Sequence, residues 1–323
     1  MPVHAFVFPG QGSQSVGMGR ELAAAFAPAR AVFEEVDETL KQALSRLIFE
    51  GPADELMLTE NTQPALMAMS LAVLRVLEVE GGFRLAEKAR LVAGHSLGEY
   101  SALAAACSFS IADAAALLRL RGRAMQKAVP QGVGAMAALL GADLAAAQEI
   151  CAEAAVVPES ATGEREVIEP ANDNGGGQVV VSGHAGAIER AIGIAQAKGV
   201  RRAMRLPVSA PFHCALMGPA AEAMAEALDK TPPRPPSVPV IANVTAAKAT
   251  DPAEIGELLI RQITATVRWR ESVEAMVAMG VDSFVEIGAG KVLSGLVKRI
   301  APDATPRAAA TPAEVEALLK VLA

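Results

Sequence analysis

The five-residue motif Gly-His-Ser-Leu-Gly at positions 94–98 constrains the fold of this chain more than any other feature. A predicted strand over 89–93, apolar from residue 91, precedes it, and an Ala- and Leu-rich segment from residue 101 onward follows it. A strand, a sharp turn and a helix in this order form a nucleophile elbow, in which glycines avoid clashes and a serine hydroxyl stands clear of the sheet. So short a motif also arises by chance, but its flanks favour the elbow. The motif therefore predicts Ser96 as a nucleophile.

The composition is typical of a compact protein. The chain has 323 residues, 52% hydrophobic and 20% charged, enough for one large or two ordinary domains. A net charge of −7 argues against a nucleic-acid partner. Residues 1–8 are typical of a first strand and not of a signal peptide, and the apolar segments are too short or too interrupted to span a bilayer. Because the three cysteines lack paired spacing, we expect no zinc site and a reducing compartment, hence a soluble cytoplasmic protein without a membrane partner.

A glycine-rich loop at 9–19 follows the first strand and precedes a predicted helix over 21–44. Exposed backbone N–H groups at the start of a helix suit an anionic oxygen. The dinucleotide-binding motif G-x-G-x-x-G would need glycine where the chain has Ser15. An oxyanion hole fits the elbow better, with one N–H from the residue after the nucleophile and one from this loop. The predicted donors are the backbone N–H groups of Leu97 and Gln11.

One arginine lies on the apolar face of a predicted helix over 111–129. At 100° per residue, Arg121 is in phase with the apolar side chains, whereas Arg119 and Arg123 fall on the opposite side. An inward guanidinium needs an anionic partner because leaving it unpaired is costly. An internal carboxylate, a stem that reaches back to solvent and a ligand carboxylate all remain open at this point.

A glutamine lies at the start of another helix. The sequence predicts a loop over 59–64 and then a helix over 65–77, with Thr62 as a possible cap and a proline near the first turn. Gln63 could point into a site, although a helix-start amide more often bonds to the backbone.

The character of the chain changes after residue 130. The sequence predicts strands over 135–140 and 179–182, helices over 143–155 and 185–198, an edge strand over 202–206 and a polar turn over 172–177. Two strand–helix pairs with an additional edge strand predict a small ferredoxin-like domain. We expect residues 131–205 to be inserted into a larger domain that comprises residues 1–130 and 206–323.

The last third of the chain supplies a candidate general base. Of the four histidines, His4 falls in a strand, His184 in a turn, and His95 beside the nucleophile and facing away from it. His213 remains, in a loop between two elements, where catalytic residues concentrate. Beyond it the sequence predicts a strand over 238–243, helices over 255–264 and 272–279, a last strand over 283–287, a helix over 292–300 and a terminal helix.

Taken together, these motifs resemble those of the malonyl-CoA:acyl carrier protein transacylase family of fatty-acid synthesis. They occur in order along nearly the whole chain: Phe8-Pro9-Gly10-Gln11-Gly12-Ser13-Gln14, Thr62-Gln63-Pro64-Ala65, Gly94-His95-Ser96-Leu97-Gly98-Glu99-Tyr100, Arg121-Gly122, Phe212-His213, Arg261-Gln262 and Glu286-Ile287-Gly288 with Gly290-Lys291-Val292-Leu293. The resemblance implies an α/β fold, with an α/β-hydrolase-like large domain built on a parallel sheet and an inserted ferredoxin-like small domain. The chain departs from the family at Ala289, where proline is frequent.

The resemblance also implies roles for single residues. Ser96 would be acylated, His213 would be the base, and Arg121 would bind the free carboxylate of malonate. Gln262 would orient the histidine through its backbone carbonyl, in place of an acidic third member. Phe212 resembles the residue that selects malonyl in related domains, where a bulky ring would crowd an α-methyl group.

The implied reaction is a ping-pong transfer of malonyl from malonyl-CoA to the phosphopantetheine thiol of acyl carrier protein. The coenzyme A thioester is a substrate, and no metal or redox cofactor is expected. The alternatives are a serine hydrolase or thioesterase, a trans-acting malonyltransferase associated with a polyketide synthase, and a non-catalytic docking or nucleotide-binding module. An inward Arg121 argues against the hydrolase, because a lipase-like site has no use for a buried cation.

Overall fold

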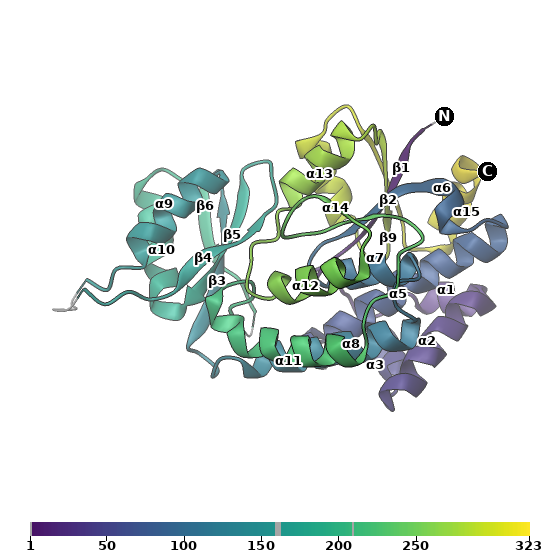
Figure 1. The fold of residues 1–323 in the computed structure, drawn as a ribbon, viewed down its shortest axis with the longest axis horizontal. Coiled ribbons are helices and arrows are strands. Elements are labelled where there is room, and N and C mark those ends of the chain that lie inside the picture. Colours follow the sequence, from purple (N-terminus) through teal and green to yellow (C-terminus); the bar gives the residue numbers. More distant parts are fainter. Residues whose placement is uncertain (1, 159–162, 209) are drawn as a thin grey trace.

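The computed structural model describes residues 2–158, 163–208 and 210–323 and contains two β-sheets. In Figure 1 the larger sheet and most helices form one lobe, and the smaller sheet with two helices forms a second lobe at one end of the long axis. We call these the large lobe and the small lobe, the latter running from residue 134 to 205.

The sheet of the large lobe has the strand order β10 (Thr305–Ala309), β9 (Ser283–Ile287), β1 (His4–Phe8), β2 (Ala89–Gly94), β7 (Val240–Ile241) and β8 (Lys248–Ala249). Neighbouring strands are parallel except β8, which is antiparallel to β7 at one edge. Every residue of β1 is buried. Phe6 and Phe8 belong to one core and Ala5 and Val7 to another, so the sheet is covered on both faces, as an apolar parallel strand requires. The predicted α/β class with a parallel sheet is confirmed.

The prediction from the sequence does not include the edge strand β10 and makes β9 the last strand. Within β10, Pro306 and Arg307 interrupt the apolar pattern and most positions are at least partly exposed. An edge strand tolerates proline and charge because one of its sides makes no ladder hydrogen bonds. The hydrophobic pattern therefore gives little signal for it.

The large lobe contains the helices α1 (Arg20–Ala25), α2 (Ala27–Leu40), α3 (Leu44–Glu50), α4 (Ala53–Met57), α5 (Thr59–Gly81), α6 (Leu85–Lys88), α7 (Leu97–Ala105), α8 (Ile111–Lys127), α11 (Gly218–Lys230), α12 (Pro252–Gln262), α13 (Trp269–Ala278), α14 (Val292–Ile300) and α15 (Pro312–Leu322), and a 3₁₀ turn η1 (Ala215–Met217). The single helix predicted over 21–44 is wrong. Phe26 is extended and separates α1 from α2, whose second residue is Pro28, a residue that favours a helix start.

Helix α5 starts earlier than the sequence predicts. The expected loop over 59–64 is helical, and Leu58 and not Thr62 is the N-cap. The Thr62 hydroxyl instead donates to the carbonyls of Leu56 and Leu58 at 2.6 and 3.2 Å. Because α5 is buried almost continuously from Thr59 to Leu77, tertiary packing outweighs the helix-breaking signal of Pro64.

The small lobe has the chain order of a ferredoxin-like fold: β3 (Gly134–Leu140), α9 (Leu144–Ala154), β4 (Ile168–Asp173), β5 (Gln178–His184), α10 (Ala185–Ala197) and β6 (Arg202–Arg205). Its strands are antiparallel in the order β4-β5-β3-β6. The sequence missed β4, whose end it assigned to the turn over 172–177. Pro170 lies within β4 next to an irregularity in the strand register, which hides the alternating pattern.

The two lobes share a core and a backbone contact. Met136 and Val180 of the small lobe pack in the main core of the large lobe together with Phe212. The N–H of Asp173 donates to the carbonyl of Val267 at 2.9 Å, and the N–H of Val267 donates to the carbonyl of Ala171 at 2.8 Å. These contacts hold the small sheet beside the end of β2, where the elbow lies.

Candidate active site

The turn between β2 and α7 has the backbone of a nucleophile elbow. Ser96 has φ 54° and ψ −112°, a conformation that non-glycine residues rarely adopt. A Cβ atom at Gly94 would lie 1.8 Å from the carbonyl oxygen of Gly98, and a Cβ at Gly98 would lie 2.2 Å from that of Phe8. Both positions therefore require glycine, which is what the motif predicts.

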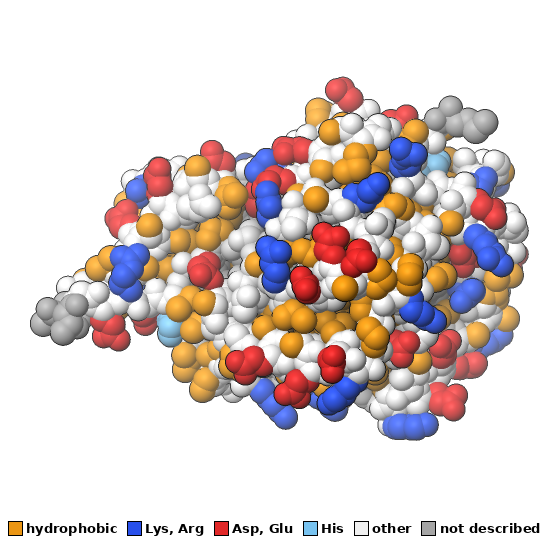
Figure 2. All heavy atoms as spheres, in the orientation of Figure 1, with side chains coloured by type: hydrophobic (Ala, Val, Ile, Leu, Met, Phe, Trp, Pro, Cys, Tyr) orange, Lys and Arg blue, Asp and Glu red, His pale blue; other side chains and the backbone are white. Residues whose placement is uncertain are grey.

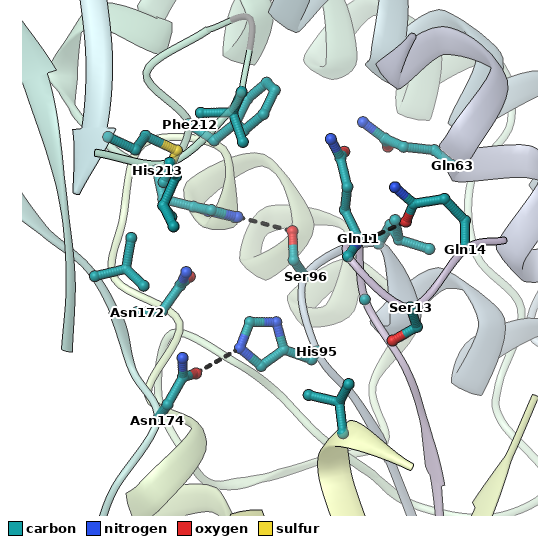
Figure 3. Close-up of a pocket in the computed structure, with 18 of the residues that line it drawn as sticks. Gln11, Ser13, Gln14, Gln63, His95, Ser96, Asn172, Asn174, Phe212 and His213 are labelled. Atoms are coloured by element: carbon teal, nitrogen blue, oxygen red, sulfur yellow. Dashed lines mark hydrogen bonds between the residues drawn. The ribbon is translucent and has the colours of Figure 1, made fainter. Parts of the chain in front are cut away.

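Ser96 and His213 lie in contact although 117 residues separate them. The hydroxyl of Ser96 is 2.7 Å from Nε2 of His213 (Figure 3). The carbonyl oxygen of Gln262 is 2.8 Å from Nδ1 of the same ring. A carbonyl only accepts, so Nδ1 carries the proton and Nε2 is free to accept one from the serine. Burial, and next the charge of Arg121, lower the pKa of His213 to about 3, so the imidazole is neutral at physiological pH.

Arg121 extends from α8 into the same site and is only 1% exposed. One terminal nitrogen donates to Oε1 of Gln63 at 2.8 Å, and the other donates to Oε1 of Gln262 at 2.8 Å and to the hydroxyl of Ser96 at 3.2 Å. Within the described ranges, no carboxylate forms an ion pair with this guanidinium. The sequence left three possibilities open for the guanidinium of Arg121. The structure shows no ion pair with a described carboxylate, and the guanidinium faces the cavity.

Arg119 is buried, although the sequence places it on the side of the helix opposite the apolar face. It is 8% exposed, and its guanidinium donates to Oδ1 of Asn61 at 2.8 Å and to the side chain of Gln42. Helix α8 packs against both α2 and α5, so more of its circumference is covered than a single apolar stripe suggests. Arg123 is exposed as predicted and pairs with Glu60 at 2.6 Å.

The cavity around these groups has a volume of about 380 Å³ and is lined by both lobes. Gln11 and Phe212 line it from the large lobe and Asn172 and Asn174 from the small lobe (Figure 3). Leu97 lines it as well. As the first residue of α7, Leu97 has a backbone N–H that the helix does not use. The side chain of Gln11 accepts a hydrogen bond from the hydroxyl of Thr59 at 2.8 Å, which fixes the loop beside the elbow.

His95 also lines the cavity but bonds away from the nucleophile. Its Nε2 lies 2.8 Å from Oδ1 of Asn174 in the small lobe (Figure 3), and its ring lies 5.7 Å from that of Trp269. Burial lowers the pKa of His95. This histidine therefore ties the elbow to the small lobe.

The sequence did not single out Glu99 and Asn243, which lie directly behind the nucleophile. Glu99 is 1% exposed, and its Oε2 accepts hydrogen bonds from the N–H of Asn243 at 3.0 Å and from Nε2 of Gln262 at 2.8 Å. Burial raises the pKa of Glu99 to about 7. The available signals were a carboxylate three residues after the nucleophile in an otherwise apolar helix, and an asparagine just beyond a short strand.

The face of the molecule in Figure 2 carries acidic and basic side chains side by side and no continuous basic surface, which agrees with the net charge of −7. No helix in the described part of the chain is long and apolar enough to cross a membrane.

The fold and the site define an acyltransferase. The chain belongs to the family described as acyl transferase domain, which matches residues 5–314. The malonyl CoA-acyl carrier protein transacylase of Salmonella typhimurium is 46% identical over 319 residues, which are 99% of each chain. The crystal structure of an acyl-carrier-protein-S-malonyltransferase from Bartonella henselae superimposes with a TM-score of 0.94 at 53% identity, covering 99% of each chain. A malonyl-transacylase solved in complex with its type II PKS acyl-carrier protein superimposes with a TM-score of 0.93 at 41% identity, again over 99% of each chain.

Proposed function

We propose that this chain transfers a malonyl group from malonyl-CoA to the phosphopantetheine thiol of acyl carrier protein, through a malonyl-Ser96 intermediate. The observation that carries the proposal is the buried guanidinium of Arg121, which has no ion-pair partner among the described residues and lies 3.2 Å from the nucleophilic hydroxyl. The names and the high similarity of the relatives support the same activity.

The first half-reaction acylates Ser96. As its oxygen attacks the thioester carbonyl, Nε2 of His213 takes the hydroxyl proton. The backbone N–H groups of Leu97 and Gln11 stabilise the negative charge that develops on the carbonyl oxygen. When the tetrahedral intermediate collapses, the proton on His213 passes to the departing sulfur, and coenzyme A leaves as a thiol.

The second half-reaction reverses these steps with a new thiol. His213 takes the proton of the phosphopantetheine thiol, whose sulfur attacks the ester carbonyl of malonyl-Ser96. Collapse of the intermediate returns the proton to the oxygen of Ser96. Because Gln262 holds Nδ1, the ring presents Nε2 in both directions, and the proposed chemistry requires no metal or redox cofactor.

Selection of malonyl follows from the geometry of the guanidinium. Gln63 and Gln262 each hold one of its terminal nitrogens, which fixes the plane of the group toward the cavity. A malonyl carboxylate can accept two parallel charge-assisted hydrogen bonds, whereas an acetyl group accepts none. An acyl group without this charge would leave Arg121 buried and unpaired, so discrimination should be strong. Phe212 lines the same cavity, where its ring would crowd an α-methyl substituent.

Mass spectrometry of the protein mixed with malonyl-CoA alone tests this function. We expect one malonyl adduct on Ser96 that persists until acyl carrier protein is added and then moves to the carrier, and no adduct on Ser96→Ala. Rapid release of malonate to water without a carrier would instead identify a thioesterase. Running the second step with a fatty-acid carrier and with a type II polyketide carrier separates the two proposed partners. We also propose a cytoplasmic location, in keeping with free thiols at Cys107, Cys151 and Cys214.

A further inference from the structure

The backbone of the elbow is strained at Ser96, so neighbouring groups must hold it in this conformation. Ser96 adopts a positive φ of 54°, and such strained conformations persist only where the surroundings enforce them. Within the turn, the N–H of Gly98 donates to the carbonyl of His95 at 2.9 Å and the N–H of Glu99 donates to that of Ser96 at 3.0 Å, but the N–H of Ser96 itself donates to a side chain.

The side chain of Asn243 bonds to two backbone groups of the turn, the carbonyl of Gly94 and the N–H of Ser96. Its Oδ1 accepts the backbone N–H of Ser96 at 2.8 Å, and its Nδ2 donates to the carbonyl of Gly94 at 2.7 Å. Asn243 follows β7, the neighbour of β2 in the sheet, and is completely buried. Its Oδ1 also accepts a hydrogen bond from Nε2 of Gln262 at 3.2 Å, so the side chain is bonded entirely inside the protein, and two of its bonds go to the peptide groups on either side of His95, just before the nucleophile.

Asn243 is held in turn by the elbow helix. Oε2 of Glu99, in the first turn of α7, accepts the backbone N–H of Asn243 at 3.0 Å. The same oxygen accepts a hydrogen bond from Nε2 of Gln262 at 2.8 Å. This bond fixes the orientation of the Gln262 amide, so that its oxygen faces Arg121. The segment after β7 and the elbow are therefore bonded reciprocally, and through Gln262 this network reaches both the base and the guanidinium.

We infer that Asn243 is a positioning residue: together with Glu99, it holds the strained elbow so that the hydroxyl of Ser96 meets both Nε2 of His213 and the reacting carbonyl. The inference rests on the proposed function only in that Ser96 is the nucleophile. A misplacement of about 1 Å at a reacting atom can lower a rate about 100-fold. The loss should therefore appear in the reactivity of Ser96 itself and not in the preference between acyl groups.

The test measures the rate at which phenylmethanesulfonyl fluoride labels Ser96, alongside acylation by malonyl-CoA and by acetyl-CoA. For Asn243→Ala we expect all three rates per reactive site to fall together, by about 10- to 100-fold, with an unchanged ratio of malonyl to acetyl acylation. Asn243→Asp keeps an acceptor for the N–H of Ser96 but turns a second oxygen toward Gly94, and we expect a fall of the same kind. Because the aspartate is isosteric, it tests the inference even if the alanine variant does not fold.

Ser108→Ala is the matched control, since it removes a buried side-chain hydrogen bond to the carbonyl of Arg234, 2.6 Å long, outside the catalytic network. If the role of Asn243 were purely structural, a smaller fraction of the variant molecules would be labelled, as we expect for this control. The molecules that are labelled would then react at the rate of the parent protein. Labelling rates within about twofold of the parent in the folded Asn243 variants would overturn the inference. Failure of malonyl transfer with normal sulfonyl labelling of the parent would count against the proposed function instead.

Discussion

At the scale of single residues, we propose that Arg121 carries the distinction between acyl groups. Replacing it with alanine should lower malonyl acylation by at least about 100-fold, because two charge-assisted hydrogen bonds are lost, while acetyl acylation changes much less. Paired rate measurements with malonyl-CoA and acetyl-CoA give the ratio. Arg123→Ala on the same helix is the control, since that side chain is exposed and pairs with Glu60. An equal loss for both donors in Arg121→Ala would remove its role in selection.

Glu99 makes the stability of the fold depend on pH in a defined direction. Burial raises its pKa to about 7 from 4.5, so the folded state binds more protons than the unfolded state between these values. The contribution of Glu99 to the free energy of unfolding is therefore present at low pH and falls as the pH rises toward 7. Glu99→Gln lacks this titration, so the parent should lose stability relative to the variant over that range.

Denaturant titrations of both proteins, repeated from about pH 5.5 to about pH 8, measure the difference between their free energies of unfolding. We expect the difference to change below pH 7 and to level off above it. A difference that is constant across the range would show that Glu99 is ionised throughout.

The residues predicted from the sequence are those that carry a local signal. Ser96 lies in a motif, Arg121 interrupts an apolar stripe, and His213 was left after other histidines were assigned; the structure brings all three together, while their roles remain proposals. Glu99 and Asn243 carry no comparable signal. Asn243 bonds to Ser96, 147 residues earlier, and only the folded sheet brings them together.

At the scale of elements, the close approach of α8 to α5 sets the position of the guanidinium. A Cβ atom at Gly122 would lie 2.5 Å from Cα of Glu60, so Gly122→Ala must separate the two helices. This overpacking should cost about 1–3 kcal/mol of stability. Because Arg121 is the preceding residue and Gln63 lies on α5, the ratio of malonyl to acetyl acylation should also fall.

Gly193→Ala is the matched helical control for this variant. Its added Cβ, on α10, would meet no described atom within 4 Å. It should stabilise the protein by about 0.5–1 kcal/mol, the ordinary effect of replacing a helical glycine, without altering either rate. Thermal unfolding and the paired acylation assay measure both effects. Normal stability and selectivity in Gly122→Ala would show that the helices can separate without moving Arg121.

Central elements could be predicted and peripheral ones could not. Apolar residues dominate the strands β1, β2 and β9, which are buried over most of their length, so composition marks them. The edge strand β10 and the bulged strand β4 contain proline, and α5 begins within a polar, proline-containing segment. In those places tertiary contacts decide the structure, and local propensity opposes it.

At the scale of the whole molecule, we propose that residues 131–205 form an inserted domain that does not unfold independently. Its own core includes Leu139 and Val181, but Met136 and Val180 belong to the main core, and β4 bonds to the backbone of Val267. Loss of either lobe would therefore expose apolar surface of the other, which favours a single cooperative transition.

Urea unfolding followed with two probes tests this cooperativity. Trp269, the only tryptophan, is buried in the large lobe, so its fluorescence reports on that lobe, while far-ultraviolet circular dichroism reports on both. We expect the two transitions to coincide. A dichroism change that precedes the fluorescence change would mean that the small lobe opens first and that the shared core is weak.

Gln262 uses its backbone and its side chain for different tasks. The carbonyl holds the ring of His213, and the side-chain oxygen accepts from the guanidinium of Arg121. Replacing Arg121 to admit uncharged acyl chains leaves that buried oxygen without its donor, while the bonds of Nε2 to Glu99 and to the carbonyl of Ser96 keep the amide and the peptide that orients the ring in place. Engineers who wish to broaden the acyl range should therefore supply a new donor to the side-chain oxygen of Gln262 when they exchange Arg121, because a buried acceptor without a donor destabilises the protein.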